Sequence, residues 1–203
     1  MKFVAAWVGV ALGIGSAMMS TDAQGQQDSA GQVEKRVAPV DSVDLDRYAG
    51  RWYEVARFPN SFQEDCTGET VAEYERLSNG QIRVVNSCRH SDGTMKRAEG
   101  RAKVARRGGP TSKLKVRFAP AFLSFLPMVW GDYWILDLTE DYTAALVGDP
   151  GREYLWVLSR TPVMPDTTYR RMVNAAVGQG FDVRRLQRSP IAADSTPAPP
   201  QPE

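Results

Sequence analysis

The stretch Gly50-Arg51-Trp52-Tyr53-Glu54-Val55-Ala56-Arg57-Phe58-Pro59 decides the fold, because it opens the part of the chain where strand patterns begin. A second short stretch, Leu158-Ser159-Arg160, ends the last long apolar strand that the sequence predicts. A guanidinium group can lie over the face of an indole ring. We therefore expect Arg160 to stack on Trp52 and to close one end of a barrel, leaving the other end open for an apolar ligand.

Alternation of apolar and polar residues between these two stretches predicts an all-β fold. Strands are expected at residues 51–58, 70–76, 81–89, 95–106, 113–118, 132–138, 142–147 and 154–159. Asn79-Gly80 is a tight hairpin turn between two of them. These strands suit an eight-stranded up-and-down antiparallel β-barrel, which has no exposed edge and can hold one small ligand.

Helical spacing replaces the alternation only after the last of these strands. Apolar residues then recur at Tyr169, Met172, Val173, Ala176 and Val177. Asp166 follows Pro165 as a candidate cap, and Gly180 provides a stop. We expect one C-terminal α-helix packed against the outside of the barrel, followed by a ninth strand at residues 181–186.

The ends of the chain differ from the predicted domain at residues 41–188. Residues 1–23 combine a basic start, an apolar run and a small residue, which predicts a signal peptide; an uncleaved anchor is the alternative. Residues 24–40 are a predicted linker, and the proline-rich residues 189–203 a predicted disordered tail. The net charge of +1 gives no indication of a nucleic-acid partner.

Export gives the two cysteines of the chain a meaning. The chain has two cysteines, Cys66 and Cys88, and an even number of cysteines in an oxidising compartment favours disulfide pairing. They are expected at the far ends of two strands that are joined by the Asn79-Gly80 turn. A disulfide between them is the favoured prediction, and two free thiols are the alternative.

Three motifs resemble the lipocalin family, in particular the bacterial lipocalins of the outer-membrane Blc type and their relative apolipoprotein D. They are the stretch 50–59, Asp137-Leu138-Thr139-Glu140-Asp141-Tyr142 and Tyr154-Leu155-Trp156-Val157-Leu158-Ser159-Arg160-Thr161-Pro162. The resemblance implies a protein that binds fatty acids or lysophospholipids in a barrel calyx, for storage or transport in cell-envelope maintenance, often as a homodimer and without a cofactor. Because no cysteine follows the apolar N-terminal run, we expect periplasmic or secreted placement rather than a lipid anchor in the outer membrane.

Candidate site residues fall into two groups at the two ends of the barrel. The closed end is expected to contain Gly50, Trp52, Asp141, Tyr142 and Arg160. Trp156 lies further up the wall, where it is expected to contact an acyl chain; weaker candidates by the same strand parity are Tyr74, Phe118 and Trp134. The alternative is that these side chains simply fill the barrel, as they do in small barrels.

The loop at residues 119–130 is unusually apolar for a connection between strands. Such a loop must cover something, meet a partner or touch a membrane. One hypothesis is a lip at the barrel mouth, formed by Phe122, Leu123, Phe125 and Leu126, that contacts a membrane or a second copy. A lid folded over the cavity is the alternative. A different function would be a protein-interaction module that uses this loop and has a filled barrel.

Enzyme functions find little support in the sequence. His90 is the single histidine, so a Ser/His/Asp relay has one possible base, and no nucleophile motif surrounds it. A single histidine also gives no cluster for a transition metal. One enzymatic alternative remains, isomerase chemistry by a free calyx thiol at Cys66 or Cys88, as the resemblance implies for a few lipocalins. We expect a binding protein without a cofactor or metal.

Overall fold

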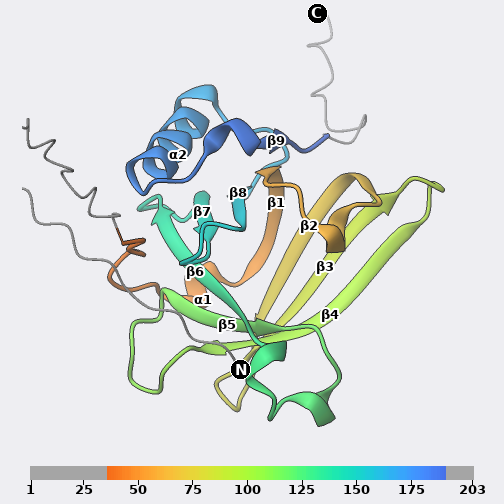
Figure 1. Ribbon diagram of the computed structural model, residues 1–203, viewed down its shortest axis with the longest axis vertical. Coiled ribbons are helices and arrows are strands. Elements are labelled where there is room, and N and C mark those ends of the chain that lie inside the picture. Colours follow the sequence, from red (N-terminus) through yellow and green to blue (C-terminus); the bar gives the residue numbers. More distant parts are fainter. Residues whose placement is uncertain (1–35, 191–203) are drawn as a thin grey trace, which may run out of the picture. The chain divides into compact units, whose positions relative to one another are not determined.

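The computed structural model describes residues 36–190 (Figure 1). The signal peptide expected at 1–23, most of the linker expected at 24–40 and nearly all of the tail expected at 189–203 lie outside these residues. The main elements are α1 (Leu45–Tyr48), β1 (Gly50–Arg57), β2 (Cys66–Arg76), β3 (Ile82–His90), β4 (Met95–Val104), β5 (Lys113–Arg117), β6 (Gly131–Leu138), β7 (Ala144–Gly148), β8 (Leu155–Ser159), α2 (Asp166–Gly178) and β9 (Gln187–Arg188).

The strands form a closed barrel, as the sequence predicts. Each strand from β1 to β8 pairs with its neighbour in an antiparallel register, and β1 also pairs with β8. The closing β1–β8 pair places Tyr53 opposite Ser159, while the β1–β2 pair runs from Gly50 opposite Tyr74 to Tyr53 opposite Val71. The eight-stranded fold class is therefore confirmed, with β9 as an additional strand beside β1.

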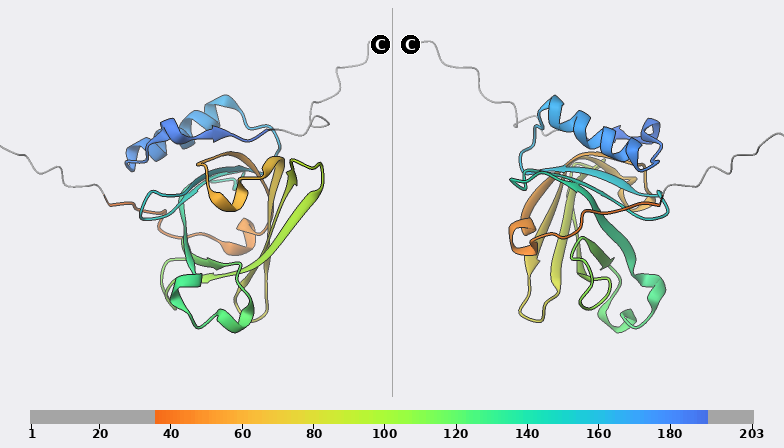
Figure 2. Two further views of the ribbon diagram at one scale, coloured as in Figure 1. Left: turned by 45° about the vertical axis from the view of Figure 1, so that its right-hand side comes forward. Right: turned by 90° about the vertical axis from the view of Figure 1, so that its left-hand side faces the viewer.

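Apolar side chains pack on both faces of the barrel wall. On β8, Leu155 and Val157 belong to an outer cluster under α2, whereas Trp156 and Leu158 belong to an inner cluster. Helix α2 lies outside the barrel against β6 and β7, with Met172 fully buried (Figure 2). The expected position of the helix is confirmed. Its cap differs, because Asp166 is the first helical residue and Pro165 precedes it without a side-chain hydrogen bond.

The folded part extends beyond the predicted limits of 41–188 at both ends. Val37 is buried in the outer cluster, and the Val40 amide donates to the Ile135 carbonyl over 3.0 Å. The Ser189 amide donates to the Val55 carbonyl over 3.0 Å. Composition does not reveal such anchors, because two of the three attachments are made by backbone groups. Val37 and Val40 from the predicted linker and Ser189 from the predicted tail are thus attached to the barrel.

The ninth strand also begins later than expected. Residues 183–185 form a short 3-10 turn, and only Gln187–Arg188 pairs with β1. Within the described part of the chain, no helix has the length and apolar character needed to cross a membrane.

Candidate ligand-binding site

Helix α1 covers one end of the barrel. Asp44 caps it by accepting hydrogen bonds from the amides of Asp46 and Arg47 over 2.9 and 3.2 Å. The helix positions Tyr48, whose carbonyl accepts a hydrogen bond of 2.8 Å from the indole Nε1 of Trp52. Trp52 has no exposed surface. This short helix, for which the sequence offers no periodic pattern, therefore seals the barrel together with the indole.

Arg160 stacks on the Trp52 indole at this closed end of the barrel. Its guanidinium carbon is 4.0 Å from the centre of the Trp52 indole. The guanidinium also donates to four backbone carbonyls, those of Arg47 (2.7 Å), Arg51 (2.9 Å), Tyr48 (3.2 Å) and Tyr142 (3.2 Å). Burial lowers the pKa of Arg160 from its usual value, and the neighbouring Tyr48 opposes that shift. The cation thus ties α1, β1 and the β6–β7 turn together.

The remaining residues expected at the closed end have different surroundings. Tyr142 accepts a hydrogen bond from the Asp44 amide over 2.9 Å, and its ring lies 3.9 Å from the Arg47 guanidinium. Asp141 accepts from the Thr143 amide and hydroxyl over 3.2 and 2.8 Å, which orders the turn. The structure therefore brings Gly50, Trp52, Tyr142 and Arg160 together, with Asp141 in the adjoining turn.

Three tyrosines form a cluster beside Trp52, and two of them, Tyr74 and Tyr133, form the floor of the cavity. The Tyr133 hydroxyl is 2.8 Å from that of Tyr48 and 2.9 Å from that of Tyr74. Burial raises the pKa of Tyr74 to about 12, and it raises the pKa values of Tyr48 and Tyr133 well above the usual value. All three phenols are therefore neutral at physiological pH. Tyr133 was not among the predicted site residues, although it lies on the same inward face as Ile135.

A cavity of about 620 Å³ occupies the space above this floor and opens at the opposite end of the barrel. Pockets for small ligands commonly have volumes of about 300–1,000 Å³. Trp156, Tyr74 and Phe118, all predicted to contact a ligand, line it. Leu114 and Val116 supply aliphatic surface on the neighbouring wall. The interior is therefore hollow, with room for an acyl chain.

Trp134, the fourth predicted ligand residue, lies on the wrong face of the wall. It packs against the outer cluster, with the Lys113 ammonium 4.3 Å from its ring centre, and it does not line the cavity. The adjacent Ile135 and Leu136 are both buried, one on each face of β6. Because α2 covers the outer face here, alternation of polarity is lost and cannot reveal which side chains point inward. The prediction for Trp134 is corrected accordingly.

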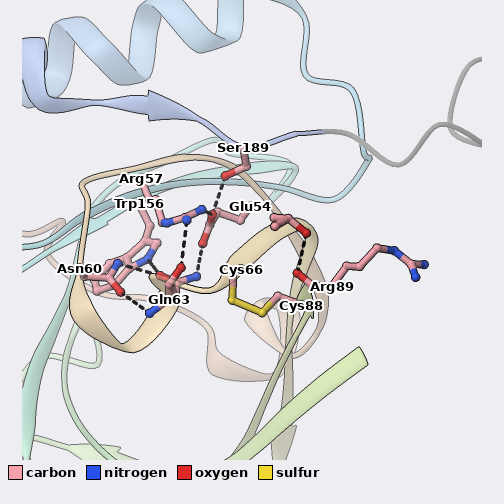
Figure 3. The surroundings of a disulfide bond; sticks show 10 residues. Glu54, Arg57, Asn60, Gln63, Cys66, Cys88, Arg89, Trp156 and Ser189 are labelled. Atoms are coloured by element: carbon pink, nitrogen blue, oxygen red, sulfur yellow. Dashed lines mark hydrogen bonds and ion pairs between the residues drawn. A yellow bond between two sulfur atoms is a disulfide. The ribbon is translucent and has the colours of Figure 1, made fainter. Parts of the chain in front are cut away.

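A hydrogen-bonded network lines the upper wall beside the disulfide (Figure 3). Glu54 bonds to Arg57 over 2.7 Å and accepts a hydrogen bond of 2.6 Å from the Gln63 amide. Gln63 in turn accepts a hydrogen bond of 3.1 Å from the indole of Trp156, and the Ser189 hydroxyl donates to Glu54. A register shift in β1 between Glu54 and Ala56 allows Glu54 and Arg57 to meet. Simple alternation along β1 does not indicate this shift.

The predicted disulfide is confirmed. Cys66 and Cys88 are bonded, with their Cα atoms 5.6 Å apart, and register shifts in β2 place Cys66 opposite His90. These are the two cysteines of the sequence, so the isomerase alternative has no free thiol. The ligand atoms of Cys66, Cys88 and His90 lie within 4.8 Å of one another, but sulfur atoms in a disulfide offer no thiolate to a metal.

The apolar loop at residues 119–130 lies at the end of the molecule opposite α2, as both views of Figure 2 show. Phe122 and Phe125 are 74% and 76% exposed, whereas Leu123 and Leu126 are half-buried. Further along, Met128, Val129 and Trp130 line the cavity. The loop thus borders the mouth with residues 128–130 and presents Phe122 and Phe125 to solvent.

The family model described as "Lipocalin-like domain" matches residues 43–191. The temperature-induced lipocalin-1 of Arabidopsis thaliana is 42% identical over 77% of this chain and 84% of its own length. The outer membrane lipoprotein Blc of Escherichia coli K12 is 37% identical, covering 74% of this chain and 80% of its own. Apolipoprotein D of Mus musculus is 31% identical, covering 82% of this chain and 86% of its own length.

Solved structures share the fold at lower identity. Insecticyanin from Manduca sexta superposes with a TM-score of 0.61 at 22% identity, over 78% of this chain and 86% of its own. Lobster apocrustacyanin A1 superposes with a TM-score of 0.59 at 17% identity, over 79% of this chain and 93% of its own. Bacterial, plant and animal proteins all match, so these similarities do not separate a bacterial Blc type from the other branches.

Proposed function

The chain belongs to the lipocalin family, and from this premise we propose that it binds an amphipathic lipid, a fatty acid or a lysophospholipid. The acyl chain would lie in the cavity and the polar end at its mouth. One observation carries the proposal, namely a cavity of about 620 Å³ that is open at one end and floored by a hydrogen-bonded tyrosine cluster at the other. Burial of the chain stabilises the complex by about 0.8 kcal/mol per methylene.

Trp156, Tyr74 and Phe118 are the proposed chain contacts, because all three line the cavity. Trp156 is held in place through its hydrogen bond to Gln63. The Trp52–Arg160 pair has a structural role in this proposal, since it seals the floor from below. Function then consists of solubilising and exchanging a lipid, without any bond being made or broken.

The cellular setting is also part of the proposal. We place the protein among the bacterial lipocalins of the Blc type, exported and acting in cell-envelope maintenance. The proposed location is the periplasm or the outer membrane, with secretion as an alternative. The similarity to proteins named outer membrane lipoprotein Blc and the confirmed disulfide support export.

The exposed side chains of Phe122 and Phe125 support peripheral contact between the cavity mouth and a membrane surface. Together with Leu123 and Leu126 they form the apolar lip of the proposal. The same surface favours a second candidate function, in which the lip binds a protein or forms a homodimer. The filled barrel expected for an interaction module is contradicted by the cavity of about 620 Å³, so this candidate differs from the first only if the cavity takes up no lipid.

Lipid identification tests the primary proposal directly. The full-length protein, purified without harsh detergent, is examined by native mass spectrometry, and its organic extract is analysed for lipids. A co-purified single-chain lipid, or saturable uptake of one on addition, is the expected result. A cavity that takes up no acyl probe at all contradicts lipid binding and leaves the interaction module.

A further inference from the structure

The ionisable side chains that line the cavity all carry one sign of charge. Within residues 36–190, the lining includes four carboxylates and no lysine, arginine or histidine; the carboxylates belong to Glu54, Asp132, Asp149 and Glu153. A carboxylate ligand placed in this mouth would meet groups of its own charge. A cation would meet groups of opposite charge in a site with low-dielectric walls, where such attractions are strengthened.

Three aromatic rings stand among these carboxylates. The ring centres of Phe62 and Tyr154 are 5.8 Å apart, those of Phe62 and Trp156 are 6.2 Å apart, and those of Tyr154 and Trp156 are 5.8 Å apart. All three rings line the cavity, and Phe62 is 61% exposed at its entrance. An ammonium group within about 6 Å of an aromatic ring centre is attracted to the face of that ring.

Hydrogen bonds link residues that carry the rings to two of the carboxylates, through the Tyr154 backbone on one side and through Gln63 on the other. The Asp149 carboxylate accepts hydrogen bonds from the backbone amides of Tyr154 over 2.7 Å and Gly151 over 2.8 Å, and Glu153 precedes Tyr154 in the chain. On the other side, Gln63 accepts from Trp156 over 3.1 Å and donates to Glu54 over 2.6 Å. The aromatic group therefore has carboxylates on both flanks.

Three basic side chains near the mouth contact residues that line the cavity, without lining it themselves. Arg57 bonds to Glu54 over 2.7 Å, and Lys115 bonds to Asp132 over 2.9 Å. Lys103 lies 4.0 Å from the centre of the Trp130 ring. These cations neutralise Glu54 and Asp132 in part but do not line the cavity. The flank formed by Asp149, Glu153 and the three rings is thus the part of the mouth best suited to a cation.

We propose that this flank, formed by Phe62, Tyr154, Trp156, Asp149 and Glu153, is a binding site for an ammonium group at the polar end of a single-chain lipid. The proposal rests on the lipid-binding function proposed above and narrows its ligand class. We expect the highest affinity for a lipid with a quaternary or primary ammonium, a lower affinity for a neutral lipid, and the lowest affinity for a lipid that ends in a free carboxylate.

Three probes with the same chain length separate head-group selectivity from chain binding. They are dodecyltrimethylammonium, 1-monododecanoylglycerol and dodecanoate, each used below its micelle concentration at pH 7.4 and low ionic strength. Calorimetry on the full-length protein is expected to show a Kd for the ammonium probe about tenfold lower than that for dodecanoate, with the glyceride between them. Added salt should weaken binding of the ammonium probe more than binding of the glyceride.

Single substitutions test whether the preference for the ammonium probe depends on the proposed site. Tyr154→Leu, Phe62→Leu and Glu153→Gln should each reduce the preference for the ammonium probe over the glyceride by about threefold or more. Glu64→Gln, at an exposed carboxylate that does not line the cavity, should leave the preference unchanged. Phe118→Leu changes a lining ring outside the aromatic group, so all three affinities should shift together.

The outcomes distinguish the two proposals. If none of the three probes binds, the lipid-binding function itself is contradicted. If dodecanoate binds as tightly as the ammonium probe, lipid binding stands and the ammonium site is overturned. If the ammonium preference persists undiminished in Tyr154→Leu, Phe62→Leu and Glu153→Gln, the site assigned here is overturned as well.

Discussion

A methyl group on residue 50 would press against Arg160, because an ideal Cβ built on Gly50 lies 3.3 Å from Nη1 of that arginine. Gly50 also has a φ of +94°, which side-chain-bearing residues rarely adopt. Two separate physical reasons thus require glycine at the entrance to β1. The guanidinium can occupy its position over Trp52 only when residue 50 leaves that space open.

Gly50→Ala should therefore lower the free energy of unfolding by about 2–3 kcal/mol, the sum of backbone strain and the displaced guanidinium. Gly80→Ala is the matched control, because Gly80 has a φ of +81° and no atom within 4 Å of the added Cβ. Urea denaturation of both variants separates the two contributions. Equal losses in the two variants would show that the contact with Arg160 does not matter.

Arg160→Met should lower the free energy of unfolding by about 2–4 kcal/mol, because four backbone carbonyls lose a charged donor and the indole loses its cation. Arg171→Met is the control, since Arg171 is half-exposed and its ion pair with Asp137 lies at the surface. That variant should lose less than about 1 kcal/mol. Similar losses for both arginines, measured by urea denaturation, would contradict a sealing role for Arg160.

The tyrosine floor predicts a loss of stability at alkaline pH. Tyr74 has a pKa of about 12 when folded, above its usual value of 10.0, so the unfolded chain releases the proton first. This contribution is fully present below pH 10 and is lost as the pH rises toward 12, by about 1.4 kcal/mol per pH unit. Tyr74→Phe should make the decline between pH 10 and 12 shallower. Unchanged slopes in denaturation series across this range would contradict the assignment.

Trp156→Phe should remove much of the change in tryptophan fluorescence that accompanies lipid binding, because Trp156 lines the cavity. Trp134→Phe is the control, since Trp134 packs in the outer cluster and should leave the response intact. The measurement is a titration of each variant with one acyl probe. Full quenching in Trp156→Phe would show that this indole does not contact the chain.

The exposed lip predicts that membrane binding depends on aromatic side chains. Burying a phenylalanine side chain is worth about 1.5–3 kcal/mol, so Phe125→Ser should weaken partition into phospholipid vesicles at least about tenfold. Val177→Ser removes an exposed apolar residue from α2 and serves as the control. Vesicle flotation and size-exclusion chromatography are the measurements. If Phe125→Ser alters neither vesicle binding nor oligomeric state, the lip has no such role.

Residue patterns were sufficient to predict the barrel because its strands have distinct faces. On β4, for example, Ala102 is buried inside while Lys103 is exposed, so alternation reveals the inward side. The same logic fails for β6, where Ile135 and Leu136 are both buried and Trp134 was assigned to the wrong face. Strand parity is informative only where one side of the wall faces water.

Pairings across the chain were harder to predict than the strands. Trp52 and Arg160 could be expected to meet because each carries a recognisable motif. Glu54 and Arg57 meet through a register shift, and Tyr48 reaches Trp52 through a four-residue helix. Neither feature produces a periodic pattern, and both depend on the closure of the barrel. The aromatic group of Phe62, Tyr154 and Trp156 at the mouth was not predicted for the same reason, since Phe62 lies in a 3-10 turn.

The bond between Cys66 and Cys88 has a mechanical consequence for ligand exchange. It ties the rim ends of β2 and β3 covalently, so this half of the entrance cannot spread apart. Any widening needed to admit a bulky guest must then come from the facing half, where residues 119–130 form a long connection built of short 3-10 turns. The covalent tie therefore restricts this side of the entrance more than the side formed by residues 119–130.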